Sequence, residues 1–191
     1  MGMQNWVTAR RVAPAAGSSF GSFTTAKTVI PPTGLYVIRA GQLFVGAATR
    51  ISVVGGIGNL ITTPGTIEFQ VKIGSVVAFT SGAIQLNATA HTNLPFWLQI
   101  MLTCRSIGDG TNAKLIGQAL AFGNMFTVTA AQVDGLNTHA YKLAPATAPA
   151  EGTGFDSTAD QIVDFWAGFS INDAANTIQI QQYLFEPLNW D

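Results

Sequence analysis

Apolar and polar residues alternate through the middle of this chain with the two-residue period of β-strands. In Ile67-Glu68-Phe69-Gln70-Val71-Lys72-Ile73, every odd position is apolar and every even position is polar. Successive side chains of a strand point to opposite faces, so this run places its apolar residues on one buried face. Gly74-Ser75 interrupts the alternation and residues 76–80 resume it, which predicts a β-hairpin.

Similar patterns along the chain predict further strands separated by turn residues. Their expected ranges are 24–30, 35–39, 42–54, 66–73, 76–80, 96–107, 114–122, 162–171 and 177–185. Gly55-Gly56-Ile57-Gly58-Asn59 is predicted to be a turn-rich loop, and residues 125–153 a long loop. The best helix candidate is residues 130–136, and His91 is predicted to lie in a loop. This spacing predicts an all-β protein, an antiparallel jelly-roll β-sandwich.

The first 22 residues differ from the rest. Ala13-Pro14-Ala15-Ala16-Gly17-Ser18-Ser19 has no periodicity and is rich in small residues, which is typical of an extended or flexible arm. We therefore expect an N-terminal arm over residues 1–22 and one sandwich domain over residues 23–191. Two interpretations of the arm are open: it is disordered, or it becomes ordered when it binds a neighbouring molecule.

Charged residues are scarce. They make up 10% of the chain, against about 25% in an ordinary soluble domain, whereas hydrophobic residues make up 48%. Such a composition suggests that copies of the chain cover much of its surface, because permanent interfaces resemble protein cores. The sequence therefore predicts a homo-oligomer.

The charges are also segregated along the sequence. Residues 1–133 carry a net charge of +6 and residues 134–191 a net charge of −7. In a sandwich the two ends of the chain interleave, so we expect much of this asymmetry to cancel; head-to-tail complementarity between subunits is the alternative. Nucleic-acid binding is not expected, because it needs a concentrated basic face and the isoelectric point is near 6.0.

The start of the chain and its apolar runs bear on localisation. The first six residues lack the pattern of a secretory signal, and no uncharged apolar run approaches the roughly 18 residues of a membrane helix. We therefore expect synthesis in a cytoplasm and no membrane partner. The single cysteine, Cys104, lies in an apolar run and is expected to act as a small core residue.

One segment matches a catalytic motif. Gly17-Ser18-Ser19-Phe20-Gly21 has the G-x-S-x-G pattern of a nucleophile elbow, and Asp134 and His139 follow in hydrolase order. An elbow needs a strand before it and a helix after it, and this segment lies in the arm. A phosphate cradle at Gly55-Gly56-Ile57-Gly58 would likewise need a following helix. We therefore expect no catalytic residues and no enzymatic activity.

Two groups of residues could be considered for metal binding. His91, His139 and Cys104 could form a three-ligand set, but none has the spacing of a metal-binding pair. The densest acidic cluster is Asp156, Asp160 and Asp164, with Glu151 near it, and it lacks the spacing of a calcium loop. Solvated or interface carboxylates are the preferred interpretation, so no metal and no cofactor is predicted.

Aromatic pairs offer the best candidates for binding. Trp97 follows Pro95-Phe96, and Trp166 follows Phe165. Alternation places one member of each pair in the core and the other on the surface of a sheet. Trp97 and Trp166 are therefore candidate contacts with another subunit or, alternatively, with a glycan.

Several segments resemble small structural proteins of tailed bacteriophages and prophages. The first is residues 63–77, where Thr63-Pro64-Gly65-Thr66 opens a strand that Gly74-Ser75 closes before Val76-Val77. Residues 87–98, 102–108 and 152–159 carry the same resemblance, which covers roughly residues 35–190 and fades in the arm.

This resemblance implies a virion component at the capsid surface, made in the bacterial host cytoplasm. It implies most specifically a capsid decoration (cement) protein that binds the major capsid protein as a homotrimer. A head-fibre, tail or tail-fibre component and a virion carbohydrate-binding module remain alternatives. The candidate capsid contacts are the arm residues Trp6, Arg10, Arg11 and Phe20.

Overall fold

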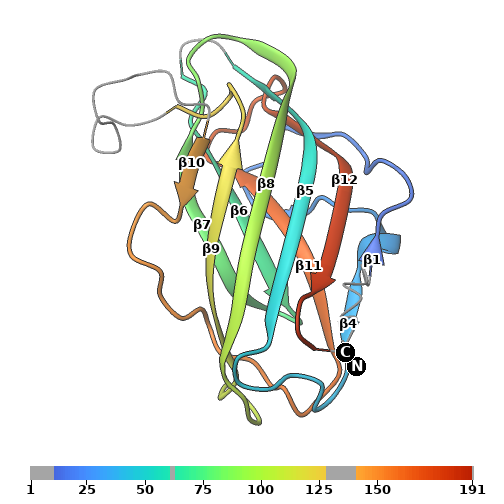
Figure 1. The fold of residues 1–191 in the computed structure, drawn as a ribbon. Coiled ribbons are helices and arrows are strands. Elements are labelled where there is room, and N and C mark those ends of the chain that lie inside the picture. The colour runs from blue at the N-terminus through green and yellow to red at the C-terminus, as the bar shows by residue number, and fades with distance from the viewer. Residues whose placement is uncertain (1–10, 61–62, 128–140, 191) are drawn as a thin grey trace, which may run out of the picture.

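Two antiparallel β-sheets pack face to face in the computed structural model, which describes residues 11–60, 63–127 and 141–190. Figure 1 shows β8, β5 and β12 in the nearer layer and β6, β7 and β11 behind them. The only helix among the described residues is the single 3-10 turn Pro32–Gly34, and no described helix is long and apolar enough to cross a membrane. The prediction of an all-β antiparallel sandwich is confirmed.

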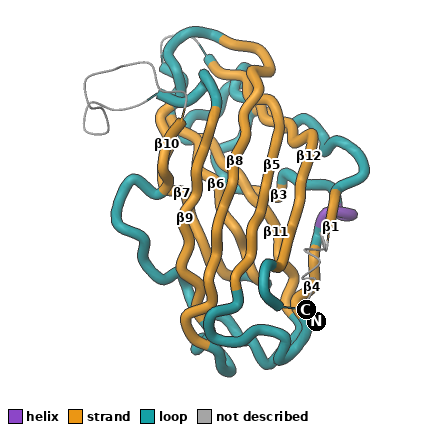
Figure 2. The backbone as a smooth tube through the Cα atoms, viewed as in Figure 1, coloured by secondary structure: helices purple, strands orange, loops and turns teal. Residues whose placement is uncertain are grey.

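The larger sheet, sheet A, contains seven strands in the order β12-β5-β8-β9-β10, with β1 and β2 both paired to the outer edge of β12. The strands are β1 (Arg11–Val12), β2 (Phe20–Gly21), β5 (Ala48–Asn59), β8 (His91–Ser106), β9 (Lys114–Phe122), β10 (Tyr141–Ala144) and β12 (Thr177–Pro187). The longest of them run side by side across one face of the molecule (Figure 2).

The smaller sheet, sheet B, contains five strands in the order β11-β6-β7, with β3 and β4 both paired to the outer edge of β11. The strands are β3 (Lys27–Thr28), β4 (Tyr36–Ile38), β6 (Thr66–Ile73), β7 (Val76–Gln85) and β11 (Gln161–Phe169). The strands β6 and β9 begin and end at the predicted residues. Gly74, with a φ of 59°, forms the predicted hairpin turn between β6 and β7.

An aromatic cluster fills the space between the sheets. The ring of Phe69 lies 5.6 Å from Phe96, 5.8 Å from Phe165 and 6.4 Å from Phe126, measured between ring centroids. All four side chains are buried, and they come from both sheets and from the loop after β9. The alternation seen in the sequence therefore builds the core that joins the two layers.

The glycine cluster at residues 55–59 corrects a prediction. It is not a turn but the second half of β5, paired to β8 and β12. A Cβ atom at Gly55 would lie 2.3 Å from the carbonyl oxygen of Gln179, and one at Gly56 would meet the side chain of Asn93. These glycines therefore serve close packing within the sheet, next to a register shift in β12 between Ile180 and Gln182.

Two further predictions need correction. His91 is the first residue of β8 rather than a loop residue. The strand begins five residues before Phe96, where the sequence predicted its start. The long predicted loop contains the short strand β10, which pairs with β9. The proposed helix at residues 130–136 lies outside the described residues.

The described part of the predicted arm, residues 11–22, is extended and lies along the edge of β12. Besides the pairs made by β1 and β2, the amide of Ala13 donates to the carbonyl of Tyr183, and that of Gly17 donates to the carbonyl of Ile180. This segment therefore covers an edge that would otherwise expose unpaired backbone groups.

The ion pairs join the two oppositely charged parts of the sequence. Among the described residues, they are Arg39 with Asp160, Arg50 with Glu186, and Lys114 with Glu151. Each cation comes from the basic part and each anion from the acidic part. Folding thus interleaves the charges that the sequence keeps apart.

Candidate functional site: two sheet surfaces

Apolar side chains cover the outer face of sheet A at the end near β10. Inward and outward positions alternate along β8, β9 and β10, and at this end of the sheet most outward positions are apolar as well as the inward ones; Gln99 and Gln118 are the polar outward residues between them. Trp97 is 44% exposed and Leu143 is 56% exposed. We call this surface the apolar face; it consists of Val54, Trp97, Met101, Leu120, Phe122, Tyr141 and Leu143.

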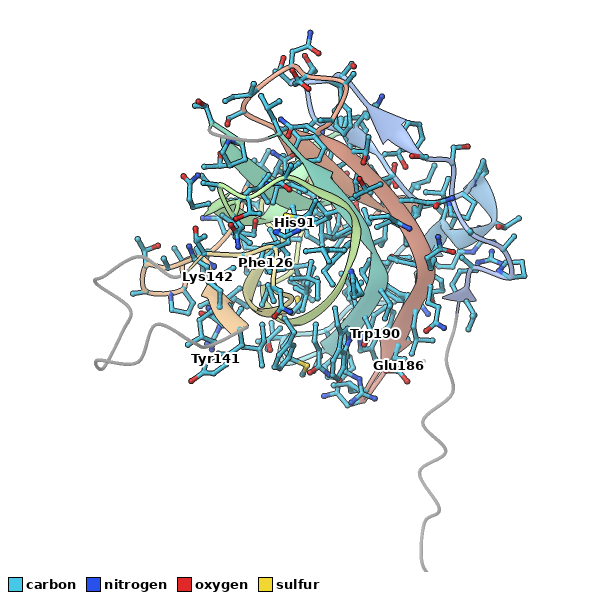
Figure 3. All side chains as sticks on the ribbon, turned by 90° about the horizontal axis from the view of Figure 1, so that it is seen from above. His91, Phe126, Tyr141, Lys142, Glu186 and Trp190 are labelled. Carbon is cyan, nitrogen blue, oxygen red and sulfur yellow. The ribbon has the colours of Figure 1, made fainter. Side chains whose placement is uncertain are left out.

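Strand register brings these residues into rows. Trp97 lies opposite Val54 on one side and Phe122 on the other, and Phe122 lies opposite Tyr141. The row therefore crosses four neighbouring strands. In the next row Leu120 lies opposite Leu143. Figure 3 shows Tyr141 pointing away from the sandwich.

The rings in the first row are packed against one another. The centroids of Trp97 and Phe122 are 5.3 Å apart with 21° between the ring planes, and Phe122 and Tyr141 are 6.4 Å apart at 52°. At 5.3 Å the rings of Trp97 and Phe122 overlap, so each covers one face of the other. The stacked pair and Tyr141 give this surface a continuous row of aromatic side chains.

The apolar face contains no charged side chain. The closest ion pair joins Arg50 Nε to Glu186 Oε2 at 2.6 Å, in the row that contains Met101. The hydrogen bond from Arg50 to Glu186 raises the pKa of the guanidinium. Because this pair neutralises itself, a partner that covers the apolar face meets no net charge there.

Lys142 leaves β10 on the side opposite to Tyr141 (Figure 3). It is 6% exposed, and burial lowers the pKa of its amine. The cation therefore faces the interior of the sandwich rather than the apolar face.

Trp166 lies on the outer face of sheet B and is held by polar neighbours. Its Nε1 donates to Asp164 Oδ2 at 2.7 Å, and Lys72 Nζ lies 3.5 Å from the ring centroid. Asp164 Oδ1 also accepts a hydrogen bond from Thr28, and burial raises the pKa of this carboxyl. One face of the indole is therefore occupied by a cation, and the ring is not an open platform.

The acidic cluster predicted from the sequence is dispersed in the structure. Asp156 accepts hydrogen bonds from the hydroxyl and amide of Thr158, and Asp160 pairs with Arg39. The hydrogen bonds donated by Thr158 lower the pKa of the Asp156 carboxyl. The pKa of the Asp160 carboxyl is also lowered, chiefly by the hydrogen bond from the Ala40 amide. No group of three possible metal ligands occurs within residues 11–60, 63–127 and 141–190.

The candidate capsid contacts are only partly within the described residues. Arg11 is exposed, and its Nε donates to the carbonyl of Leu35 at 2.9 Å. Phe20 packs against the core, and Lys27 Nζ lies 4.6 Å from its ring centroid. Trp6 and Arg10 lie outside the described residues.

The G-x-S-x-G segment lacks the context of a nucleophile elbow. Ser19 is exposed and is followed by the short strand β2 rather than by a helix. Asp134 and His139 lie outside the described residues.

Sequence reasoning singled out Trp97 but missed its neighbours Phe122, Tyr141 and Leu143. Their proximity depends on the register of β8, β9 and β10, which the sequence does not specify. One signal was present: residues 114–122 carry apolar side chains at both inward and outward positions. A strand that is apolar on both faces is expected to be covered on both faces.

Comparison with known proteins gives structural similarities only. No protein-family model matches the chain, and no curated protein matches it. The CBM2 module of the evolved Dit of Lactobacillus casei BL23 phage J-1 is 13% identical over 82% of this chain and 69% of that chain, with a TM-score of 0.29.

Two further solved structures are similar over shorter parts of their own length. They are the fructofuranosidase from Schwanniomyces occidentalis in complex with fructose (10% identity, 86% of this chain and 34% of that chain, TM-score 0.24) and the binding domain of botulinum neurotoxin serotype G (7%, 88% and 42%, TM-score 0.22).

Proposed function

We propose that this chain is a structural protein of a tailed-bacteriophage virion, most specifically a capsid decoration (cement) protein. It associates with copies of itself, as a homotrimer, and binds the major capsid protein on the head surface. The apolar face is the observation that carries the proposal, and its occupant is a second copy of the chain. The resemblance of residues 35–190 to phage structural proteins supports the virion setting.

The chemistry of the apolar face favours self-association. Close to the symmetry axis of an oligomer, identical subunits bring like side chains together, so charged residues there repel one another. The apolar face avoids this cost because its seven residues are uncharged and the neighbouring Arg50 and Glu186 neutralise each other. Contiguous apolar surface on a monomer marks a site of interaction.

The N-terminal segment is the proposed contact with the capsid. The pairing of β1 with β12 fixes Arg11 at the edge of sheet A, and residues 1–10 precede it with Trp6 and Arg10. An anchored segment that binds a neighbouring protein adds contact area without requiring the sandwich to change. Several such segments in one oligomer act together, so weak individual contacts give strong binding.

Co-sedimentation with phage heads tests this function. Expanded heads of the encoding phage, prepared without this protein, are mixed with the full-length chain and with a variant that lacks residues 1–10. We expect the full-length chain to sediment with heads and the truncated variant to remain in solution. The truncation spares β1, so circular dichroism should show an unchanged fold.

Two single substitutions provide a matched comparison. Arg11→Ala removes an exposed arginine from the proposed contact, whereas Arg105→Ala removes an exposed arginine from β8. We expect about tenfold weaker head binding for the first variant and unchanged binding for the second. Absence of head binding by the full-length chain would contradict the cement function. Electron microscopy of virions in which this protein carries a gold label would then assign it to the tail or to fibres if the label appears there.

A further inference from the structure

A hollow of about 210 Å³, lined by both polar and apolar side chains, lies on the outer face of sheet B. It is remote from the apolar face, which belongs to the other sheet. Its floor is formed by β6, β7 and β11, and one wall by the segment before β3. The residues whose chemistry matters are Thr24, Thr66, Glu68, Ala83, Gly168 and Ser170.

Small residues create this hollow. Gly168 on β11 and Ala83 on β7 lie on either side of Glu68 in one row across the sheet. The missing side chain of Gly168 also lets the wall approach, because a Cβ atom there would lie 3.1 Å from the Cα of Ala26. The small side chain of Ala83 thus leaves space beside Glu68 on one side, and the segment at Ala26 closes the hollow on the Gly168 side.

Neutral donors hold one oxygen of this carboxylate in place. Glu68 Oε1 accepts a hydrogen bond from Thr80 Oγ1 at 2.6 Å and another from Gln70 Nε2 at 2.9 Å. No cation lies within ion-pair distance of Glu68 among the described residues. The carboxylate is therefore oriented without being neutralised, and Oε2 is left as an acceptor.

Hydroxyl groups complete the lining. Ser170 Oγ accepts a hydrogen bond from the amide of Thr66 at 2.8 Å, which leaves its own proton to donate. The hydroxyls of Thr24 and Thr66 can both donate and accept. The hollow thus combines one charged hydrogen-bond acceptor with hydroxyl groups that can either donate or accept a hydrogen bond.

We propose that this hollow binds one neutral sugar unit of a glycan, with Glu68 Oε2 accepting hydrogen bonds from sugar hydroxyls. Neighbouring hydroxyls of a sugar donate to a carboxylate, and such charge-assisted bonds are the strong ones. The volume lies below the 300–1,000 Å³ typical of drug-sized ligands, which suits a single ring. Uronic and sialic acids are excluded because their carboxylates would repel Glu68.

This activity is separate from the cement function and does not depend on it. A virion protein with a sugar site on the sheet opposite its self-association surface can bind glycans while it is assembled. Loss of head binding would therefore leave the sugar site intact, and loss of sugar binding would leave head binding intact.

Ligand-observed NMR on the full-length chain tests the proposal. The probes are glucose, galactose, mannose, rhamnose, N-acetylglucosamine and glucuronic acid, each at millimolar concentration. We expect saturation transfer to at least one neutral sugar and none to glucuronic acid. Glu68→Gln retains an oxygen for the Thr80 and Gln70 donors but removes the charge, and should weaken binding about tenfold or more.

Two further variants separate the hollow from the fold. Ala83→Leu fills the hollow and should abolish binding, whereas Ala88→Leu, at an exposed position in the turn after β7, should not change it. Circular dichroism and thermal unfolding check that each variant is folded. The proposal is overturned if no neutral sugar binds, or if binding persists unchanged in both Glu68→Gln and Ala83→Leu.

Discussion

Trp97 of β8 stacks on Phe122 of β9 on the outer face of sheet A, with their ring centroids 5.3 Å apart. Neither residue belongs to the core, which is built from the alternate positions of the same strands. An aromatic pair on the outside of a sheet extends the apolar surface across the strand boundary. The pair is the basis of our proposal that this side of the sandwich meets another protein surface.

The aromatic cluster between the sheets should dominate the stability of the fold. Phe69→Ala removes a fully buried ring that contacts three other phenylalanines, so we expect the free energy of unfolding to fall by about 3–5 kcal/mol. Phe44→Ala makes the same change at an exposed position and should cost within about 0.5 kcal/mol. Urea unfolding followed by tryptophan fluorescence measures both. Equal losses in the two variants would show that the cluster is not the centre of the core.

The glycines of β5 give a graded test of packing within sheet A. In Gly55→Ala the new methyl group meets the backbone oxygen of Gln179 at 2.3 Å, so β12 must move and we expect a loss of about 1–3 kcal/mol. In Gly56→Ala it meets the side-chain end of Asn93, which can rotate away at a smaller cost. Thermal unfolding of the two variants compares them. A Gly55→Ala variant as stable as the wild type would contradict this account of the glycine cluster.

Lys142 should make the stability depend on pH in alkaline solution. Burial lowers its pKa below the ordinary 10.5, so between the two values the unfolded chain binds more protons than the folded one. The free energy of unfolding therefore rises with pH through this window. Lys142→Met keeps the volume without the charge, so we expect it to be more stable than the wild type at pH 7.

The difference between wild type and Lys142→Met should shrink as the pH approaches 10.5. Urea unfolding of both proteins at several pH values measures it, and the subtraction removes the contribution of other titrating groups. A difference that stays constant between pH 7 and pH 10.5 would show that desolvation of Lys142 is not the cause.

The alternation of side chains made much of the fold predictable. The strand β6 matches its predicted bounds because apolar and polar residues alternate along it. The strand β9 matches its predicted bounds because it is a mainly apolar run. The second half of β5 was missed because its glycines are typical of turns. Their role, close contact with Gln179 and Asn93, depends on neighbours distant in sequence.

The candidate surfaces were less predictable than the fold. Trp97 was identifiable from its position beside Phe96, but its partners come from β9 and β10, and only strand register brings them together. The hollow beside Glu68 was not predictable, since it arises from two small residues on different strands, Ala83 and Gly168. A local pattern can set the register of a hairpin, as at Gly74, but it does not say which residues of strands joined by long connections lie opposite each other.

Analytical ultracentrifugation of an apolar-face variant tests the central claim most directly. Leu143→Arg places a charge on the apolar face, and Ile162→Arg places one at a similarly exposed apolar position, 50% exposed, on β11 of the other sheet. We predict an oligomer near 60 kDa, three times the 20.1 kDa chain, for the wild type and for Ile162→Arg, and a folded monomer for Leu143→Arg. A wild-type protein that is monomeric at every concentration, or identical behaviour of the two arginine variants, would contradict the account.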